Sequence, residues 1–576
     1  MTSTALADPP AITDPVGVAE QAHLEALLRC WTRETGTAVA PGPLRIDLPA
    51  TGLALRTEVR HASATGWHRF GPVLLVRADG TTVGPADPVL AVALITAETA
   101  ACGGARPGGV PHGQSADLAA RTVDSIRRVR AFWARPRQDA PDAFLDAEQA
   151  LLLGHLHHPT PKSRDGITDA EAAAWSPELQ ASFRLQWFAA DPDQVSADAV
   201  ASSPALRGRD TAELLADLAG RPEVGGRVLV PAHPWQARDA LLRPRIAELV
   251  RAGRLEPLGE FGERWWPTSS VRTVYRPGAD VMLKLSLGLQ ITNSRRESTR
   301  TELRRGLEVH RLIDAGYTAA TTAAHPSFSI VRDPAWLAVD GGPGRQELTG
   351  LDVAVREAPD GIADLRTLVG LVAPRPGEAS RLATMVRDPV RFVADYTDSV
   401  LVPMLHLYAS TGIGLEAHQQ NTLVRLDADG RAVGGAFRDN QGYYLAASHL
   451  PRLLRAGGIN ESTLAVVDDL IVDERLSYYL LHNQVLAVVG CLAVDGLATE
   501  PELLAALVER LHAALPALAA AGRDGDRLAR RWLTAPTLPC KANLLTRLHG
   551  IDEVIAPLDA QSVYLDVPNP LLQVTT

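Results

Sequence analysis

The chain has 576 residues, of which 46% are hydrophobic and 22% charged, values typical of a soluble globular protein with two or three domains. A net charge of −10 argues against a nucleic-acid partner, and four widely spaced cysteines without a Cys-x-x-Cys pair indicate neither a disulfide scaffold nor a zinc site. Since the N-terminus lacks a basic region before an apolar run, and no stretch approaches about 18 consecutive apolar residues, we expect a cytoplasmic protein without membrane segments.

The first half of the chain predicts a fold but names no function. Apolar residues recur at helical spacing over residues 18–35, and strand-like alternation follows between residues 53 and 76. Residues 115–153 return to a helical pattern.

The first chemically distinctive segment is residues 154–166, which a glycine and two prolines predict to be a loop. His155, His157, His158, Lys162 and Arg164 suit an anion site or a solvated loop. The three histidines lack the i, i+4 spacing of a helical metal site, which disfavours a metal there.

A short apolar strand is predicted at residues 228–232. It ends in a turn that carries His233 and Gln236, where a histidine beside proline and tryptophan is more often a packed turn residue than a ligand.

Residues 267–296 form the segment around which the rest of the chain is organised. Polar and apolar residues alternate on both sides of Pro277 and Gly278, which predicts a β-hairpin that leads toward a helix. Its hydroxyls and cations suit phosphate or carboxylate groups, although an amphipathic hairpin with a solvated polar face has the same pattern. These polar residues are Ser269, Ser270, Arg272, Thr273, Lys284, Ser286, Thr292, Arg295 and Arg296.

A strongly periodic helix is predicted at residues 299–316. Arg296 and Arg300 are one helical turn apart near the start of this helix. They are expected to lie on one face, toward the hairpin. Further along, the Pro- and Gly-rich residues 373–377 are the best candidate for a boundary between two later lobes.

The final lobe is expected to be mostly helical, with a short hairpin between residues 422 and 433. Polar residues are expected to project from both ends of this hairpin, and their carboxylate and amide oxygens could hold Mg²⁺ while donors contact phosphates. The order His418, Asn421, Asp439 is also that of the catalytic and metal-binding loops of small-molecule kinases. The flanking residues are Glu416, His418, Gln420, Asn421, Arg438 and Asp439.

Lysine is rare in this chain, with Lys162, Lys284 and Lys541 among 57 lysines and arginines. A chain that otherwise uses arginine keeps lysine where a compact, mobile ammonium is needed. Each lysine lies in a motif-like segment, which favours binding roles over chance surface positions.

Together these motifs resemble the IucA/IucC family, the synthetases that build siderophores independently of nonribosomal peptide synthetases. The resemblance spans roughly residues 150–550, and only Leu156 departs from the usual proline of the first loop. It is carried by the 154–162 loop, His233 to Gln236, Ser270 to Thr273, Lys284, Thr292, Arg296, Glu416 to Asn421, Arg438, Asp439 and Lys541.

The resemblance implies an ATP-dependent, AMP-producing ligase. A carboxylate, usually one arm of citrate, would attack the α-phosphate of ATP to give an acyl-adenylate and pyrophosphate, and an amine or hydroxyl would then displace AMP. Two polyanions must meet in such a reaction, so it depends on charge neutralisation and alignment more than on a nucleophilic side chain.

The resemblance also assigns roles by motif. Ser270, Arg272, Thr273 and Lys284 would contact the ATP phosphates; Gln420, Asn421 and Asp439 would hold nucleotide and Mg²⁺, with Glu416 a weaker metal candidate. Thr292, Arg296, His418 and Lys541 would be catalytic. The carboxylate substrate would be bordered by His158, Lys162, Thr292, Arg296, His418 and Lys541.

The implied architecture is α+β and shaped like a cupped hand. It would comprise an N-terminal thumb at residues 1–185, a fingers domain with an antiparallel sheet and the ATP-binding hairpin at 186–378, and a mostly helical palm at 379–576. The resemblance also implies a homodimer.

Two other interpretations stay open: a small-molecule phosphotransferase using His418, Asn421 and Asp439, and a nonenzymatic module that binds carboxylates or nucleotides. The His158 and Lys162 loop and Lys541 have no place in the kinase pattern, which favours the synthetase.

Overall fold

The computed structural model describes residues 14–101, 112–292, 294–341, 346–375, 378–455, 464–551 and 561–574. Helices alternate with sheets that are mostly antiparallel, which confirms the predicted α+β class. Of the cysteines, Cys30, Cys491 and Cys540 are buried and not disulfide-bonded, whereas Cys102 lies outside the described ranges.

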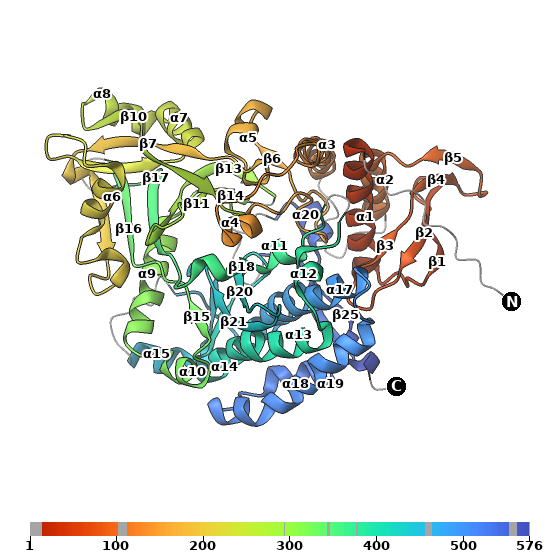
Figure 1. Cartoon of the computed structure of the whole chain (residues 1–576). Helices are drawn as coiled ribbons and strands as arrows, with labels where there is room; N and C mark the ends of the chain where they lie inside the picture. Colours follow the sequence, from red (N-terminus) through yellow and green to blue (C-terminus); the bar gives the residue numbers. More distant parts are fainter. Residues whose placement is uncertain are drawn as a thin grey trace.

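The N-terminal part packs a small antiparallel sheet, with strand order β1-β2-β4-β5 and β3 on β2, against helices α1 and α2 (Figure 1). The predicted helix at 18–35 and the strands between 53 and 76 are confirmed. A continuous helix over 115–153 is wrong: α3 ends at Ala134, and Pro136 and Pro141 interrupt it before α4. The elements are α1 (Pro15–Thr35), β1 (Gly42–Leu48), β2 (Leu53–His61), β3 (Arg69–Phe70), β4 (Leu74–Arg77), β5 (Thr82–Pro85), α2 (Pro88–Ala101), α3 (His112–Ala134) and α4 (Ala143–Glu148).

An eight-stranded sheet with order β8-β16-β17-β12-β11-β10-β7-β9 dominates the middle of the chain. Apolar side chains of the sheet form a hydrophobic core with the helices that cover it, such as α6 and α8. These elements are β7 (Phe183–Ala190), β8 (Val195–Ala199), α6 (Thr211–Ala219), β9 (Val228–Ala232), α7 (Pro234–Leu242), α8 (Pro244–Arg251), β10 (Leu255–Pro267), β11 (Thr273–Tyr275), β12 (Val281–Leu285), β16 (Ala335–Gly341) and β17 (Gln346–Glu357).

The predicted central hairpin is present as β11 and β12, which pair antiparallel with Thr273 opposite Lys284. Pro277 precedes Gly278, whose φ of 78° closes the turn. A second, three-stranded sheet with order β14-β13-β6 follows, and then the predicted helix, α9. Their bounds are β6 (Arg164–Asp165), α5 (Asp169–Trp175), β13 (Leu287–Ile291), β14 (Ser294–Arg296) and α9 (Arg300–Asp314).

The expected shared face of Arg296 and Arg300 is wrong. Arg296 ends strand β14, whereas Arg300 is the first residue of α9 and pairs with Asp340 of β16 at 2.6 Å. The chain turns between strand and helix, so helical spacing does not apply to this pair.

The C-terminal part is mostly helical around a four-stranded sheet with order β15-β21-β20-β18. The predicted hairpin is confirmed as β20 and β21. Strands β15 and β18 belong to this sheet although they precede residue 378, so the predicted boundary there stays a prediction; residues 376–377 lie outside the described ranges. Elements up to residue 455 are α10 (Ala319–Ala324), β15 (Phe328–Ile330), β18 (Leu365–Thr367), α11 (Leu368–Val372), α12 (Arg381–Met385), α13 (Pro389–Tyr396), α14 (Val402–Thr411), β19 (Ile413–Leu415), β20 (Thr422–Leu426), β21 (Ala432–Phe437), β22 (Tyr443–Ala446) and α15 (Leu450–Arg455).

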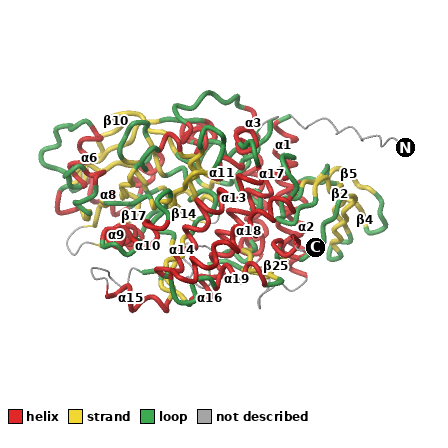
Figure 2. Tube along the Cα trace, turned by 60° about the horizontal axis from the view of Figure 1, so that its bottom comes forward, coloured by secondary structure: helices red, strands yellow, loops and turns green. Residues whose placement is uncertain are grey.

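Two helical stretches, Asp469–Val494 and Glu500–Ala521, are long and apolar enough to cross a membrane, with 89% and 39% of their most apolar windows buried in the protein. They pack with α13 in the helical layer of Figure 2. The first contains a π-helical segment, η8 (Ser477–Val485), between α16 and α17. The remaining elements are β23 (Val466–Val467), α16 (Asp469–Leu476), α17 (Leu486–Val494), α18 (Glu500–Ala521), α19 (Arg527–Thr534), β24 (Thr537–Lys541), α20 (Asn543–Leu548) and β25 (Tyr564–Pro568).

The end of the chain returns to its beginning. Leu544 and Leu548 of α20 lie in the N-terminal hydrophobic core. Glu34 of α1 accepts hydrogen bonds from the backbone amides of Leu544 and Leu545, both at 2.8 Å. This contact fixes the segment directly after Lys541.

Candidate active site

All residues to which the family resemblance assigns a role line one cavity of about 670 Å³, whereas the anion-site candidates His157 and Ser286 do not line it. Its walls come from the 154–164 loop, the hairpin region 268–305, the segments that flank the β20 and β21 hairpin, and the segments around residues 478 and 541. The predicted residues that it brings together are His158, Lys162, Ser270, Arg272, Thr273, Lys284, Thr292, Arg296, Glu416, His418, Gln420, Asn421, Asp439 and Lys541.

A tight turn between β10 and β11 presents hydroxyl groups to the cavity. The Val271 amide donates to the Thr268 carbonyl at 2.8 Å, and the Thr273 amide donates to Ser270 Oγ at 3.1 Å. Arg272 follows, and its guanidinium donates to the Arg296 carbonyl at 2.8 Å. The turn thus holds Ser270, Arg272 and Thr273 in fixed positions relative to Arg296.

Backbone strain gathers at this cavity. Of the seven described non-glycine residues with positive φ, three line it: Val271 at 67°, Thr292 at 54° and Asp439 at 85°. Valine and threonine are β-branched and rarely adopt this conformation, which costs about 1–3 kcal/mol per residue. Such strain persists only where the surrounding structure enforces it, and it is typical of functional sites.

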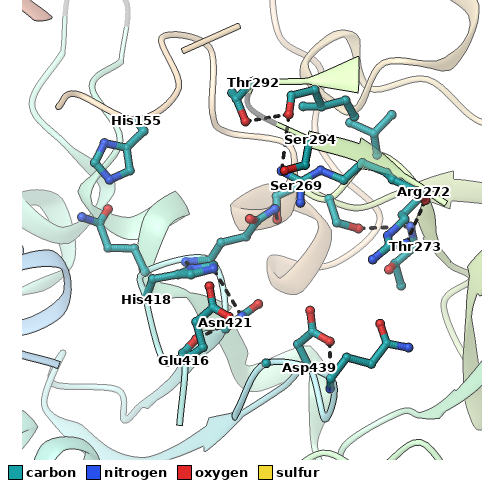
Figure 3. A pocket seen from close by; sticks show the side chains of 18 of the residues that line it. His155, Ser269, Arg272, Thr273, Thr292, Ser294, Glu416, His418, Asn421 and Asp439 are labelled. Atoms are coloured by element: carbon teal, nitrogen blue, oxygen red, sulfur yellow. Dashed lines mark hydrogen bonds between the residues drawn. The ribbon is translucent and has the colours of Figure 1, made fainter. Parts of the chain in front are cut away.

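Lys284 and Asp439 form an ion pair in the part of the cavity where Figure 3 shows the Asp439 side chain. Lys284 Nζ lies 2.6 Å from Asp439 Oδ1 and 2.6 Å from Gln441 Oε1. Burial lowers the pKa of Lys284 to about 8, against the Asp439 charge, which raises it. Although burial acts in the opposite direction, Lys284 and Arg356 hold the pKa of Asp439 well below its usual range.

This low lysine pKa predicts a pH dependence. Because Lys284 is charged only below about pH 8 in the free protein, kcat/KM for ATP should be level below that pH and fall above it, by about tenfold per pH unit. Steady-state kinetics between about pH 6.5 and about pH 9.5 measure this profile. In Lys284→Arg the guanidinium stays charged, so the fall should vanish; a fall that persists in this variant would assign it to another group.

The β20 and β21 hairpin brings together the predicted residues between Glu416 and Asp439. The residue before β20 and the residue after β21 are neighbours, because the Arg438 amide donates to the Asn421 carbonyl at 3.0 Å. Asn421 Nδ2 donates to the Glu416 carbonyl at 3.1 Å. Antiparallel pairing therefore places Glu416, Asn421 and Asp439 at the same end of the hairpin, so the expectation that polar groups project from both ends is wrong.

Histidines and Lys541 line another part of the cavity. Burial, together with the charges of Lys541 and Arg296, lowers the pKa of His418 to about 4 although the Asp439 charge raises it, so the imidazole is neutral near pH 7. His155 shares this environment: burial lowers its pKa to about 3, with smaller contributions from His158, His418 and Lys541. Lys541 Nζ lies 6.0 Å from the centre of the Tyr478 ring. Lys541 and Arg296 thus act on the same imidazole, although about 250 residues separate them in the chain.

Lys162 lines the cavity, but its ammonium already has a partner. Nζ lies 2.5 Å from Glu178 Oε1, which Arg164 also contacts at 2.5 Å. All three side chains are buried. This charge cluster gives Lys162 a structural role in holding the loop, and its predicted contact with substrate stays a prediction.

His233 and Gln236 have structural roles. His233 accepts a hydrogen bond from the Trp235 amide at 3.1 Å, and Gln236 Oε1 accepts one from the Gly288 amide at 2.6 Å. Both side chains are fully buried, as the packed-turn interpretation predicts.

Sequence reasoning missed an aromatic wall. Four of the nine tyrosines line the cavity, as the adjacent pairs Tyr443–Tyr444 and Tyr478–Tyr479. The second pair lies in the π-helical segment η8, a geometry frequent at functional sites. The sequence signal for this aromatic wall was the presence of two adjacent tyrosine pairs in a chain with few tyrosines. His155 and Ser269, which the sequence suggested for anion binding, also line the cavity, as do Gln441 and Asn483, for which no role was predicted.

The carboxylates suit Mg²⁺ bound together with phosphates. Mg²⁺ usually takes one or two carboxylates, several waters and substrate phosphate oxygens. Asp439 and Glu416 both line the cavity, on either side of Gly442, whose amide donates to the Asp439 carbonyl at 3.0 Å. Within the described ranges no group of three or more His, Cys, Asp or Glu residues could hold a metal by protein ligands alone. The donor set therefore fits a metal that enters with its nucleotide.

Comparison with protein families gives two matches along the chain. The IucA / IucC family model matches residues 143–373, and the model named ferric iron reductase FhuF-like transporter matches residues 390–555. The cavity draws residues from both matched regions.

Comparison with individual proteins gives matches over nearly the whole chain. The rhizobactin siderophore biosynthesis protein RhbC of Rhizobium meliloti (strain 1021) is 38% identical, over 96% of this chain and 97% of that protein. The spermidine-citrate ligase of Bacillus anthracis is 32% identical, over 96% and 98%. Among solved structures, the ATP-bound aerobactin synthetase IucA of Klebsiella pneumoniae is 27% identical, with a TM-score of 0.80 over 96% of this chain and 99% of that one.

Proposed function

Because this chain belongs to the IucA/IucC family, we propose that it is an ATP-dependent siderophore synthetase, which adenylates citrate or a citrate derivative and condenses it with an amine or hydroxyl nucleophile. It would release pyrophosphate in the first step and AMP in the second. The observation that carries the proposal is one shared cavity. It is lined by Lys284 and the turn between β10 and β11, and also by Arg296, His418 and Lys541.

In the first step, the side of the cavity with Ser270, Arg272, Thr273 and Lys284 binds the triphosphate. Their donors neutralise the oxygens of the leaving pyrophosphate, and the fixed turn provides them without reorganisation. Arg296, Lys541 and Thr292, with His158, hold the carboxylate so that one oxygen faces the α-phosphorus. Alignment of two anions by opposing cation groups supplies the main rate enhancement.

In the second step, an amine or hydroxyl attacks the acyl carbon and AMP leaves. His418 is neutral near pH 7 because burial keeps its pKa at about 4. Its imidazole lines the cavity together with Lys541 and Arg296, and its Nδ1 accepts a hydrogen bond from the Gln420 amide at 3.2 Å. We assign His418 to orienting the acyl group as a neutral hydrogen-bonding group, while the proton of the nucleophile passes to water.

We further propose that Asp439, with Gln420 and Asn421, holds the nucleotide and Mg²⁺, and that Glu416 is a second metal ligand. When bound, Mg²⁺ would neutralise charge on the phosphates. The carboxylate of Asp439 is positioned for this by its contact with Lys284, which fixes Oδ1 at the phosphate side.

Product analysis tests this function. Purified protein is given ATP, Mg²⁺ and, in turn, citrate, succinate, α-ketoglutarate or a citrate monoamide, with and without hydroxylamine. We expect carboxylate-dependent pyrophosphate release and a trapped hydroxamate. ADP in place of AMP and pyrophosphate would mean a phosphotransferase, and nucleotide binding without either product would mean a binding module.

Three further features belong to the same proposal. We place the thumb, fingers and palm at residues 1–185, 186–378 and 379–576, and expect a cytoplasmic homodimer. Sedimentation of the purified protein tests the dimer, and limited proteolysis, which cuts between stable domains, tests the boundaries.

A further inference from the structure

We propose that Glu148 is a positioning residue for the ATP site, because its buried carboxylate joins the Ser269 turn to the segment that carries Asp439. This inference rests on the proposed ATP site. Glu148 ends α4, which lies between the N-terminal part and the C-terminal sheet and contacts α11 and β18 (Figure 1). The side chain is fully buried, behind the cavity wall.

One oxygen of Glu148 holds the turn that presents the hydroxyls. Oε2 accepts hydrogen bonds from the Ser269 amide at 2.9 Å and from Ser269 Oγ at 2.7 Å. Ser269 directly precedes Ser270, so the carboxylate fixes the start of the strained turn at Val271. A hydrogen bond to a charged acceptor is stronger and more directional than one between neutral groups.

The same carboxylate holds Arg438 from the opposite wall. Arg438 Nη1 lies 2.6 Å from Glu148 Oε1, and Nη2 donates to Oε2 at 3.1 Å. Arg438 in turn donates to the Gln420 carbonyl from Nη2 at 2.7 Å and from Nε at 3.0 Å. Because Asp439 is the next residue, Glu148 controls the relative position of Ser269, Gln420 and Asp439.

Loss of this charge would loosen the ATP side of the cavity. In Glu148→Gln the amide cannot match both Arg438 and Ser269, and Arg438 would keep a buried charge without its carboxylate. A displacement of about 1 Å at reacting groups can cost about 100-fold in rate. We therefore expect Glu148→Gln to raise KM for ATP about 10- to 100-fold and to change KM for the carboxylate by less than about threefold.

Asp146 provides a matched control. It lies two residues earlier on α4 and also forms a bidentate pair with a buried arginine, since Arg381 donates to its two oxygens at 2.6 and 2.9 Å. Arg381 belongs to α12 in the C-terminal part. Asp146→Asn thus removes a partly exposed carboxylate–arginine bridge from the same helix without touching Ser269, Gln420 or Asp439.

The experiment compares Glu148→Gln, Glu148→Asp and Asp146→Asn in the full-length protein by ATP–pyrophosphate exchange, by calorimetric titration with ATP and Mg²⁺, and by thermal unfolding. Both neutral variants should lower Tm. Only Glu148→Gln should weaken ATP binding, and Glu148→Asp, which keeps the charge on a shorter stem, should lie between Glu148→Gln and the parent.

Equal effects of Glu148→Gln and Asp146→Asn on KM for ATP would overturn the proposal, because Glu148 would then only dock α4. If Glu148→Gln does not fold, Glu148→Asp decides: parent-like ATP binding in this variant would also reject the proposal. ATP titration separates the two levels of inference, since a parent protein that binds ATP without exchange refutes the adenylation, while the variants still test Glu148.

Discussion

Replacement of Lys541 by methionine should lower kcat/KM for the carboxylate about 100- to 1000-fold in ATP–pyrophosphate exchange, with KM for ATP changed by less than about threefold. Methionine keeps the apolar stem of this buried side chain and removes only the ammonium. The loss follows from location, because the charge of Lys541 acts on His418 and His155, where we propose that the carboxylate is held.

The backbone around Lys541 should survive the substitution. Lys541 ends β24, where it pairs with Tyr564 of β25, and Glu34 of α1 binds the helix that follows. These contacts involve backbone groups and so remain in the variant. We expect Lys541→Arg, which keeps a cation of different shape, to retain more activity than Lys541→Met.

The outcome separates two locations for the charge. A rise in KM for ATP at unchanged carboxylate kinetics would place Lys541 in the phosphate site, and unchanged turnover would remove it from the reaction. A parent-like Tm in Lys541→Met is needed to assign the loss to charge and not to unfolding.

The sequence predicted local structure well where the pattern is local. The hairpin of β11 and β12 was readable from alternation around Pro277 and Gly278, and α9 from its apolar period. Arg300 shows the limit of such local patterns. Its spacing from Arg296 suggested that both lie on one helix face, but the chain changes from strand to helix between them, and Arg300 pairs with Asp340.

The rarity of lysine identified cavity residues, but not their roles. All three lysines line the cavity. Lys162 is bound to Glu178, Lys284 to Asp439 and Gln441, and Lys541 lies beside Tyr478. The rarity of lysine indicates that an ammonium group is favoured at these positions. Which groups surround that ammonium is determined by the fold.

Glu148 could not be found from the sequence, because its importance lies in contacts across more than 100 residues. It ends a six-residue helix and has no motif of its own, whereas its partners Ser269 and Arg438 lie 121 and 290 residues away. The same holds for Glu34 and α20, which meet across about 510 residues. Motif order predicts which segments meet, and buried polar contacts determine how they are held.

Replacement of Asp439 by asparagine should lower kcat/KM for ATP about 100- to 1000-fold and raise the Mg²⁺ concentration needed for half-maximal rate. Asparagine tolerates the positive φ of 85° at this position, so the backbone should be preserved. The variant loses the charge that pairs with Lys284 at 2.6 Å and the carboxylate proposed to bind the metal.

The variant should also change the pH profile in a defined direction. The Asp439 charge raises the pKa of Lys284, which burial lowers to about 8. Without that charge the lysine should lose its proton at lower pH, so the fall in kcat/KM for ATP should begin below about pH 8. Kinetics across pH at saturating Mg²⁺ measure this shift separately from metal affinity.

Asp340→Asn is the matched control, because Asp340 is a buried carboxylate of the eight-stranded sheet, paired with Arg300 at 2.6 Å, and neither residue lines the cavity. It should lower Tm while its KM for ATP and Mg²⁺ requirement stay near those of the parent. If Asp439→Asn has an unchanged Mg²⁺ requirement but the predicted pH shift, Asp439 serves only to position Lys284, and the metal must be held by Glu416 and the phosphates. If neither changes, the Lys284–Asp439 pair is structural and the phosphate site lies elsewhere in the cavity.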